Sequence, residues 1–221
     1  MTTTFRQQIE ELDRLLLQMA SQSEEMLERS LEALLGQNAS TARVVIMKDE
    51  SVDALELVID AHILKVLALQ QPVATDLRLL LSAQKINNDL ERIADHAVNI
   101  AEAAIVLAER PHITKLVIIP KMAEIARSMV KNAIDSFTYR DTVVAQEIKL
   151  RDNEIDALYK SAKDKIADLL KEKPGNAHRV LHLLSVATDL ERVADLATNI
   201  AEEVVFIADA EVMKHKQMEP S

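Results

Sequence analysis

The sequence predicts an all-α protein made of two tandem three-helix bundles, with six long antiparallel helices related by internal duplication. The chain of 221 residues has only two Gly and five Pro, so it lacks the turn chemistry that β-hairpins need. Apolar residues recur at three-and-four spacing almost throughout, which is the period of an amphipathic helix. A cassette of fourteen residues occurs at 89–102 and again one hundred positions later at 189–202, with eleven identical pairs. Such a dense match at a fixed offset indicates a duplicated structural unit.

Helix-breaking segments divide the chain into these six helices. Breaks are expected around residues 36–40, 71–72, 110–114, 139–141 and 173–176, where Gly, Pro, Asn and Asp gather. The helices are therefore predicted at about 5–35, 40–70, 74–108, 115–138, 142–171 and 177–209. Asp141 and Asn176 precede apolar-periodic runs and are expected to cap the fifth and sixth helices. The first repeat then spans residues 1–110 and the second spans residues 111–221.

The duplication extends beyond the cassette to the other helices. Residues 49–55 match residues 152–158, and residues 26–34 match residues 129–137, both at an offset of 103. The loops at Pro72 and Pro174 absorb the difference between this offset and that of the cassette. All three helices of the unit are therefore expected twice.

Composition and charge exclude several classes of function. The absence of Cys removes thiolate nucleophiles, disulfides and zinc ribbons, and Gly36 and Gly175 alone cannot form a Gly-rich phosphate-binding loop. A net charge of −10 argues against nucleic acid as a partner. No apolar run is long enough to span a membrane. Since no nucleophile stands out either, the chain is not expected to be an enzyme.

Acidic residues form columns on the second and third helix of each repeat. Residues four apart lie one turn apart on one helix face. The columns are Glu91, Asp95 and Asn99 with Asp49 and Asp53 in the first repeat, and Glu191, Asp195 and Asn199 with Asp152 and Asp156 in the second. Up-and-down helices are antiparallel neighbours, so we expect four carboxylates to converge in each repeat.

Such oxygen-rich clusters suit a hard cation. Stacked like charges destabilise a helix, so their retention favours a compensating ion, and Mg²⁺, Ca²⁺, Mn²⁺ or oxidised iron matches carboxylate ligands. The columns flank the apolar stripe through Leu90, Ile93 and Ala97, which predicts sites at the bundle surface, partly open to water. Two alternatives remain. The carboxylates could be solvated acidic faces balanced by Arg92 and Arg192, or they could serve a metal-dependent hydrolase or a metal-storage bundle.

The two cassettes, together with residues 71–78 (Gln-Pro-Val-Ala-Thr-Asp-Leu-Arg), resemble the PhoU family of phosphate-transport accessory proteins over essentially the full chain. The second repeat departs from the family pattern, with Lys-Pro-Gly-Asn-Ala-His-Arg at 173–179. The resemblance implies a cytoplasmic regulator, usually a homodimer, that keeps phosphate-starvation genes off when phosphate is plentiful. It implies as partners the ATPase subunit of a phosphate ABC transporter and a membrane sensor histidine kinase.

The resemblance also implies a metal cluster in each repeat. By position these are Asp49, Asp53, Glu91 and Asp95 in the first repeat and Asp152, Asp156, Glu191 and Asp195 in the second, with Asn99 and Asn199 as additional positions. The identity of the ion, whether Mg, Mn, Fe, Zn or Ca, stays open.

Overall fold

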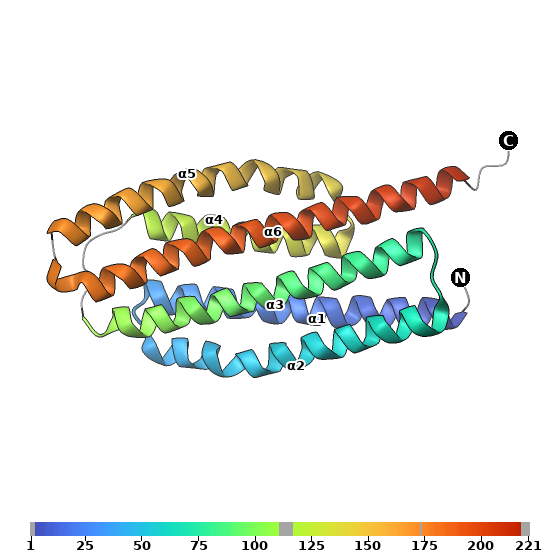
Figure 1. Ribbon diagram of the computed structural model, residues 1–221, viewed down its shortest axis with the longest axis horizontal. Coiled ribbons are helices and arrows are strands. Elements are labelled where there is room, and N and C mark those ends of the chain that lie inside the picture. The colour runs from blue at the N-terminus through green and yellow to red at the C-terminus, as the bar shows by residue number, and fades with distance from the viewer. Residues whose placement is uncertain (1–2, 111–116, 173, 218–221) are drawn as a thin grey trace.

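The computed structural model shows two three-helix bundles packed side by side along their length (Figure 1). It describes residues 3–110, 117–172 and 174–217. The first bundle contains α1 (Thr3–Leu35), α2 (Ala39–Gln70) and α3 (Thr75–Ala108), and the second contains α4 (Ile118–Tyr139), α5 (Thr142–Glu172), the short 3₁₀ turn η1 (Pro174–Asn176) and α6 (Ala177–Gln217). The predicted all-α class and duplicated architecture are confirmed.

The helix boundaries differ from the predicted ones at two places. Helix α6 continues to Gln217, whereas its apolar periodicity predicts an end near residue 209. The predicted start of the fourth helix at residue 115 and the predicted boundary between the repeats fall on or beside residues 111–116, which lie outside the described residues. None of the helices, over the ranges that the structure describes, has a stretch long and apolar enough to cross a bilayer.

The core is aliphatic and repeats between the bundles. Met19 and Met26 of α1 are fully buried, and so are their counterparts Met122 and Met129 of α4 at the predicted offset of 103. Each of the five buried residues of α5 lies 103 positions after a buried residue of α2, as Ile155 does after Val52. Because unbranched methionine fills irregular gaps, these residues are explained by packing alone.

Polar side chains cap the starts of α2 and α5. Asp141 Oδ1 accepts hydrogen bonds from the backbone N–H groups of Val143 at 2.9 Å and Val144 at 3.2 Å, which confirms the predicted cap of α5. Asn38 caps α2 in the same way, with its Oδ1 atom 3.1 Å from the backbone nitrogen of Ser40. Both caps lie in segments where the sequence predicts a break.

The loops that precede α3 and α6 are held differently. Gln71 and Ala74 in the first loop have positive φ values of 45° and 44°, and the Arg78 guanidinium lies 5.5 Å from the ring centre of Phe206 on α6. In the second repeat, Arg179 donates to the carbonyl oxygens of Leu107 at 3.0 Å and Arg110 at 2.8 Å. The second repeat, which departs from the family pattern at 173–179, therefore uses its arginine for backbone hydrogen bonds, whereas the arginine of the first repeat contacts an aromatic ring.

The two repeats meet mainly along α3 and α6, which run antiparallel through the middle of the molecule (Figure 1). Lys85 Nζ lies 2.6 Å from Glu203 Oε1, and at the opposite end of the contact Asn99 Nδ2 lies 3.5 Å from Asp189 Oδ1. This register places the buried Ala94 opposite the buried Ala194 at the centre. Small side chains there let the two helices approach closely, and they mark the pseudo-two-fold axis that relates the repeats.

Candidate functional site

The two cassettes have the same burial at all fourteen positions. Each residue of 89–102 falls in the same class, buried, half-buried or exposed, as its counterpart in 189–202. The Leu, Ile and Ala residues that the two cassettes share are buried in the core. Glu91 and Glu191 are half-buried, and Asp95 and Asp195 are exposed. The prediction that the carboxylates lie beside the core and partly open to water is confirmed.

In the first repeat the carboxylates of α2 and α3 lie close enough to influence one another. We call Asp49, Asp53, Glu91 and Asp95 the first cluster. Burial, and then the negative charges of Asp95 and Glu56, raise the pKa of Glu91 to about 7. The charges of Asp53 and Asp49, on the neighbouring helix α2, also raise the pKa of Glu91. The carboxylates of the two helices are therefore close enough for their charges to act on one another.

The second repeat brings together the equivalent groups. We call Asp152, Asp156, Glu191 and Asp195 the second cluster. Burial raises the pKa of Asp195, and the charge of Asp156 adds to that effect across the helix pair. Burial also raises the pKa of Asp152, followed by the charges of Asp195 and Asp156, while a hydrogen bond from Thr198 acts in the opposite direction. The same four positions thus form an acidic cluster in each repeat.

One carboxylate oxygen in each cluster is buried and has no hydrogen-bond partner. These atoms are Asp49 Oδ1 and Asp152 Oδ1, which occupy equivalent positions in the two repeats. Burial is the leading cause that raises the pKa of Asp49, and the neighbouring charges of Asp53 and Asp95 add to it. Burying an unpaired carboxylate oxygen costs free energy, and a coordinated cation would remove that cost.

The balancing charges predicted for a purely solvated face are present in only one repeat. Arg192 lowers the pKa of Glu191, so it partly compensates the second cluster. Its counterpart Arg92 lowers instead the pKa of Asp89, which faces the other repeat. Every neighbouring charge that acts on Glu91 is negative. The first cluster is therefore the less balanced of the two.

The structure directs the side chains of Asn99 and Asn199 toward the opposite repeat. The Asn99 amide points to Asp189, and the Asn199 amide forms a hydrogen bond with Asp89. Both asparagines are exposed members of the predicted columns, but their amides serve the contact between α3 and α6. Of the predicted columns, four carboxylates in each repeat are left as candidates for a cation site.

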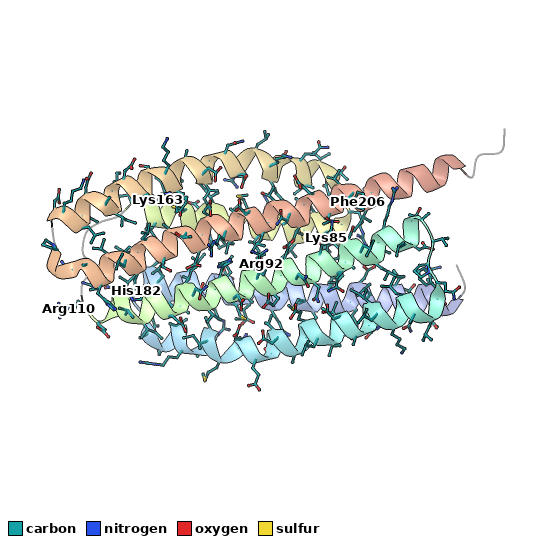
Figure 2. The ribbon with its side chains drawn as sticks, in the orientation of Figure 1. Lys85, Arg92, Arg110, Lys163, His182 and Phe206 are labelled. Atoms are coloured by element: carbon teal, nitrogen blue, oxygen red, sulfur yellow. The ribbon has the colours of Figure 1, made fainter. Side chains whose placement is uncertain are left out.

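Two acidic residues that the column argument omits extend the first cluster along α2. Glu56 and Asp60 follow Asp49 at helical spacing, and the pKa of Glu56 is raised by burial and by the charges of Asp60, Asp53 and Asp95. Asp60 also accepts a hydrogen bond from Asn87 Nδ2 at 2.8 Å. In the second repeat the same positions hold Tyr159 and Lys163, the latter seen on α5 in Figure 2. The acidic surface therefore extends further along the helix in the first repeat than in the second.

A second polar region lies at the contact between the repeats. His96 Nδ1 lies 3.0 Å from Asp189 Oδ1, and both residues are buried. At the other end of the contact, where Leu196 takes the place of the histidine, Asp89 lines a cavity of about 370 Å³ together with Lys85 and Arg92. Figure 2 labels these two basic residues. In that cavity, burial raises the pKa of Asp89 to about 6, although the Arg92 charge opposes the change. Helix periodicity cannot predict that His96 pairs with Asp189, because the pairing depends on which helices pack together.

None of the side chains in the described ranges form a preassembled metal centre. No group of three or more His, Asp or Glu residues there already has the spacing of such a centre. Mutual repulsion holds uncompensated carboxylates apart, so the clusters would have to close around an ion by changing side-chain rotamers. Their charge, oxygen chemistry and unpaired buried oxygens fit a hard cation.

Fold and site together define an all-helical, internally duplicated protein with one acidic cluster in each repeat. The chain belongs to the PhoU family, since the family model described as the PhoU domain matches residues 16–104 and 119–204. A phosphate-specific transport system accessory protein PhoU homolog from Aquifex aeolicus (strain VF5) is 37% identical over 211 residues, which cover 96% of each chain.

Two solved structures show the same fold. The crystal structure of PhoU from Pseudomonas aeruginosa superposes with a TM-score of 0.90 at 32% identity and covers 93% of this chain and 99% of that one. The phosphate transport system regulatory protein PhoU from Streptococcus pneumoniae gives a TM-score of 0.83 at 26% identity, covering 92% of this chain and 96% of that one. The family predicted from the cassettes is confirmed.

Proposed function

We propose that this protein is a cytoplasmic accessory regulator of phosphate uptake that acts by binding partner proteins and catalyses no reaction. Its relatives are described as accessory and regulatory proteins of phosphate transport. The partners we assign are the ATPase subunit of a phosphate ABC transporter and the cytoplasmic part of a sensor histidine kinase. Through them a homodimer of this chain represses the phosphate-starvation response when phosphate is plentiful.

The observation that carries the proposal is the pair of matched acidic clusters, whose residues are half-buried or exposed. A surface with no role has no reason to keep the same carboxylates in both copies of a duplicated unit. The first cluster would hold one hard cation through Asp49, Asp53, Glu91 and Asp95, and the second cluster would hold another through Asp152, Asp156, Glu191 and Asp195. The unpaired oxygens of Asp49 and Asp152 support this assignment.

A bound cation would supply charge neutralisation and a coordinate link between neighbouring helices. In the first repeat the bound carboxylates would link α2 to α3, and in the second they would link α5 to α6. Each cluster would change from a set of carboxylates that repel one another to a rigid surface with open coordination positions on the cation. Carboxylates or carbonyls of a partner could bind at these positions. That change needs no chemical step.

Co-purification of the wild-type chain with the two partners tests the function. Affinity capture is performed with the transporter ATPase and with the kinase cytoplasmic domain, at high and low phosphate, with Mn²⁺ or with a chelator. We expect capture that depends on phosphate status and weakens with the chelator. Absence of specific association in every condition contradicts the proposal, and so does metal-dependent phosphate-ester hydrolysis that is lost in the Glu91→Ala and Asp95→Ala variants.

A further inference from the structure

Helix α2 is apolar on two opposite sides. One side packs into the core through residues such as Val52, Ile59 and Ile63. The other side, which we call the outer face of α2, is exposed and consists of Met47, Ala54, Leu57, Val58, Ala61 and Leu64. Met47 is 72% exposed, Leu57 66% and Leu64 64%. The helix lies at one edge of the molecule, with this side turned away from the other helices (Figure 1).

Helix α5 shows that the fold does not require a face as apolar as the outer face of α2. It occupies the place of α2 in the second bundle, and each of its five buried residues lies 103 positions after a buried residue of α2. The counterparts of the outer face of α2 are Leu150, Ala157, Lys160, Ser161, Asp164 and Ala167. Contiguous exposed apolar surface is uncommon on a monomer and marks an interaction site. The apolar character of α2 therefore needs a partner to explain it.

The charges along the outer face make it complementary to itself. The exposed Glu50 and Lys65 lie at equal distances, about 11 Å, on either side of the midpoint between Leu57 and Val58. An antiparallel second copy, related by a two-fold axis through this midpoint, brings Glu50 of each chain level with Lys65 of the other. The same axis brings Ala54 level with Ala61, so that the helices can approach closely where the side chains are small.

We propose that the outer face of α2 is the surface through which two copies of this chain associate, antiparallel and about a two-fold axis between Leu57 and Val58. In such an isologous contact each residue meets its partner twice, so one complementary charge pair becomes two. The acidic side of α2 that carries Asp49 and Asp60 faces α3 and remains outside the contact. The inference rests on the homodimer of the proposed function and gives that dimer its interface.

The test is the oligomeric state of the full chain, measured by sedimentation equilibrium. Wild type is expected to be a dimer at micromolar concentration, and Leu57→Glu with Leu64→Glu is expected to be monomeric. The matched control is Lys160→Glu with Ala167→Glu at the equivalent positions of α5, which should remain dimeric. Circular dichroism of each variant verifies that the helices are intact.

A charge exchange tests the register without disturbing the apolar contact. Glu50→Lys alone and Lys65→Glu alone should each raise the dissociation constant by about 10-fold, because like charges then face each other twice. The double variant E50K/K65E should restore the wild-type value. Failure of the double variant to restore association overturns the register and, with it, the proposal.

Other outcomes separate this inference from the proposed function. If L57E/L64E stays dimeric, or if wild type is monomeric at all concentrations, the interface is overturned, while capture of the transporter ATPase and kinase by wild type still decides the regulatory role. If a monomeric wild type binds those partners and L57E/L64E does not, the face belongs to a partner protein and the proposal is likewise overturned.

Discussion

Helices α2 and α5 hold the same place in the two repeats, and their buried sides are nearly interchangeable. Ala42, Val45 and Val52 of α2 are buried, and so are the residues 103 positions later in α5. Toward α3, however, α2 carries the acidic Glu56 and Asp60, whereas the same positions of α5 carry Tyr159 and Lys163. Outward, three of the six apolar residues on the face of α2 are replaced on α5 by the polar or charged Lys160, Ser161 and Asp164.

This difference separates shared functions from functions of one repeat. Buried positions change little after duplication because a close-packed interior tolerates few changes in volume. Exposed positions are free to diverge, so exposed residues that remain the same in both repeats mark a role common to both. The two carboxylate clusters meet that criterion, whereas the outer face of α2 and the extended acidic surface belong to the first repeat alone.

The largest effect is expected when the outer face of α2 is transplanted onto α5. The variant carries Asn153→Glu, Lys160→Leu, Ser161→Val, Asp164→Ala, Ala167→Leu and Asp168→Lys. Since α2 and α5 lie at opposite edges of the molecule (Figure 1), each chain would present two self-complementary faces and form open chains in place of closed dimers. Light scattering should show a mass that rises with concentration beyond that of a dimer. Asp164→Ala alone serves as control, and an unchanged mass in the full variant would refute the role assigned to the face.

Removing two ligands from one cluster should weaken cation binding in that repeat only. We expect Asp53→Asn with Asp95→Asn to lower Mn²⁺ affinity at the first site by at least about 10-fold, since loss of even a supporting group costs that much. The pair Asp156→Asn and Asp195→Asn should do the same at the second site. In wild type the first site should bind more tightly, because Glu56 and Asp60 add negative charge there.

Calorimetric titration with Mn²⁺ resolves the two sites. Glu154→Gln with Asp164→Asn, at exposed positions of α5 outside the second cluster, is the control and should leave both affinities unchanged. Equal affinities for the two wild-type sites would show that the additional charges of Glu56 and Asp60 do not strengthen binding.

A bulky residue at the pseudo-two-fold axis should destabilise the protein equally from either repeat. Ala94→Leu and Ala194→Leu each introduce a larger side chain where α3 and α6 approach closely, and overpacking of that kind costs about 1 to 3 kcal/mol. Thermal unfolding should show similar decreases in Tm for both variants. The exposed Ala157→Leu is the control with little expected change. Unequal decreases would indicate that the two sides of the contact are packed differently.

The smallest effect concerns pH in the metal-free protein. The folded-state pKa of Glu91 is about 7, above its usual value of 4.5, so the folded protein holds a proton that the unfolded chain releases. Stability should therefore fall as pH rises from about 4.5 through 7. Because solvent screens this partly exposed group, the loss is on the order of 1 kcal/mol, or about 2 to 4 °C in Tm.

Comparison with Glu91→Gln isolates this contribution to the pH dependence. The variant should remove that part of the slope and raise the Tm of the metal-free protein at pH 7.5. Saturating Mn²⁺ should remove the same part of the slope in wild type. A slope that neither the substitution nor the ion changes would mean that repulsion at Glu91 does not limit stability.

Local patterns account for much of the fold and of the site. The helix period and the cap at Asp141 depend on residues a few positions apart, so the sequence contains them directly. The duplicated columns likewise predict which four carboxylates converge in each repeat. Glu56 and Asp60 continue the column of Asp49 at helical spacing, but an argument built on duplicated letters passes over them because the second repeat lacks them.

The remaining features depend on contacts between the repeats. Successive steps of four residues turn a helix by about 40° each, so Asn99 has rotated about 80° away from Glu91 and can reach α6. The pairing of His96 with Asp189 requires that α3 and α6 pack antiparallel in one particular register. Neither the period of one helix nor the repeat itself contains that information.

The most direct test of the central claim, that each repeat carries a cation site, is anomalous scattering from crystals of the wild-type chain grown with limiting Mn²⁺. The account predicts one peak beside Asp49, Asp53, Glu91 and Asp95 and a second beside Asp152, Asp156, Glu191 and Asp195, with the higher occupancy in the first repeat. Absence of a peak at both clusters when Mn²⁺ is raised to saturation would contradict it.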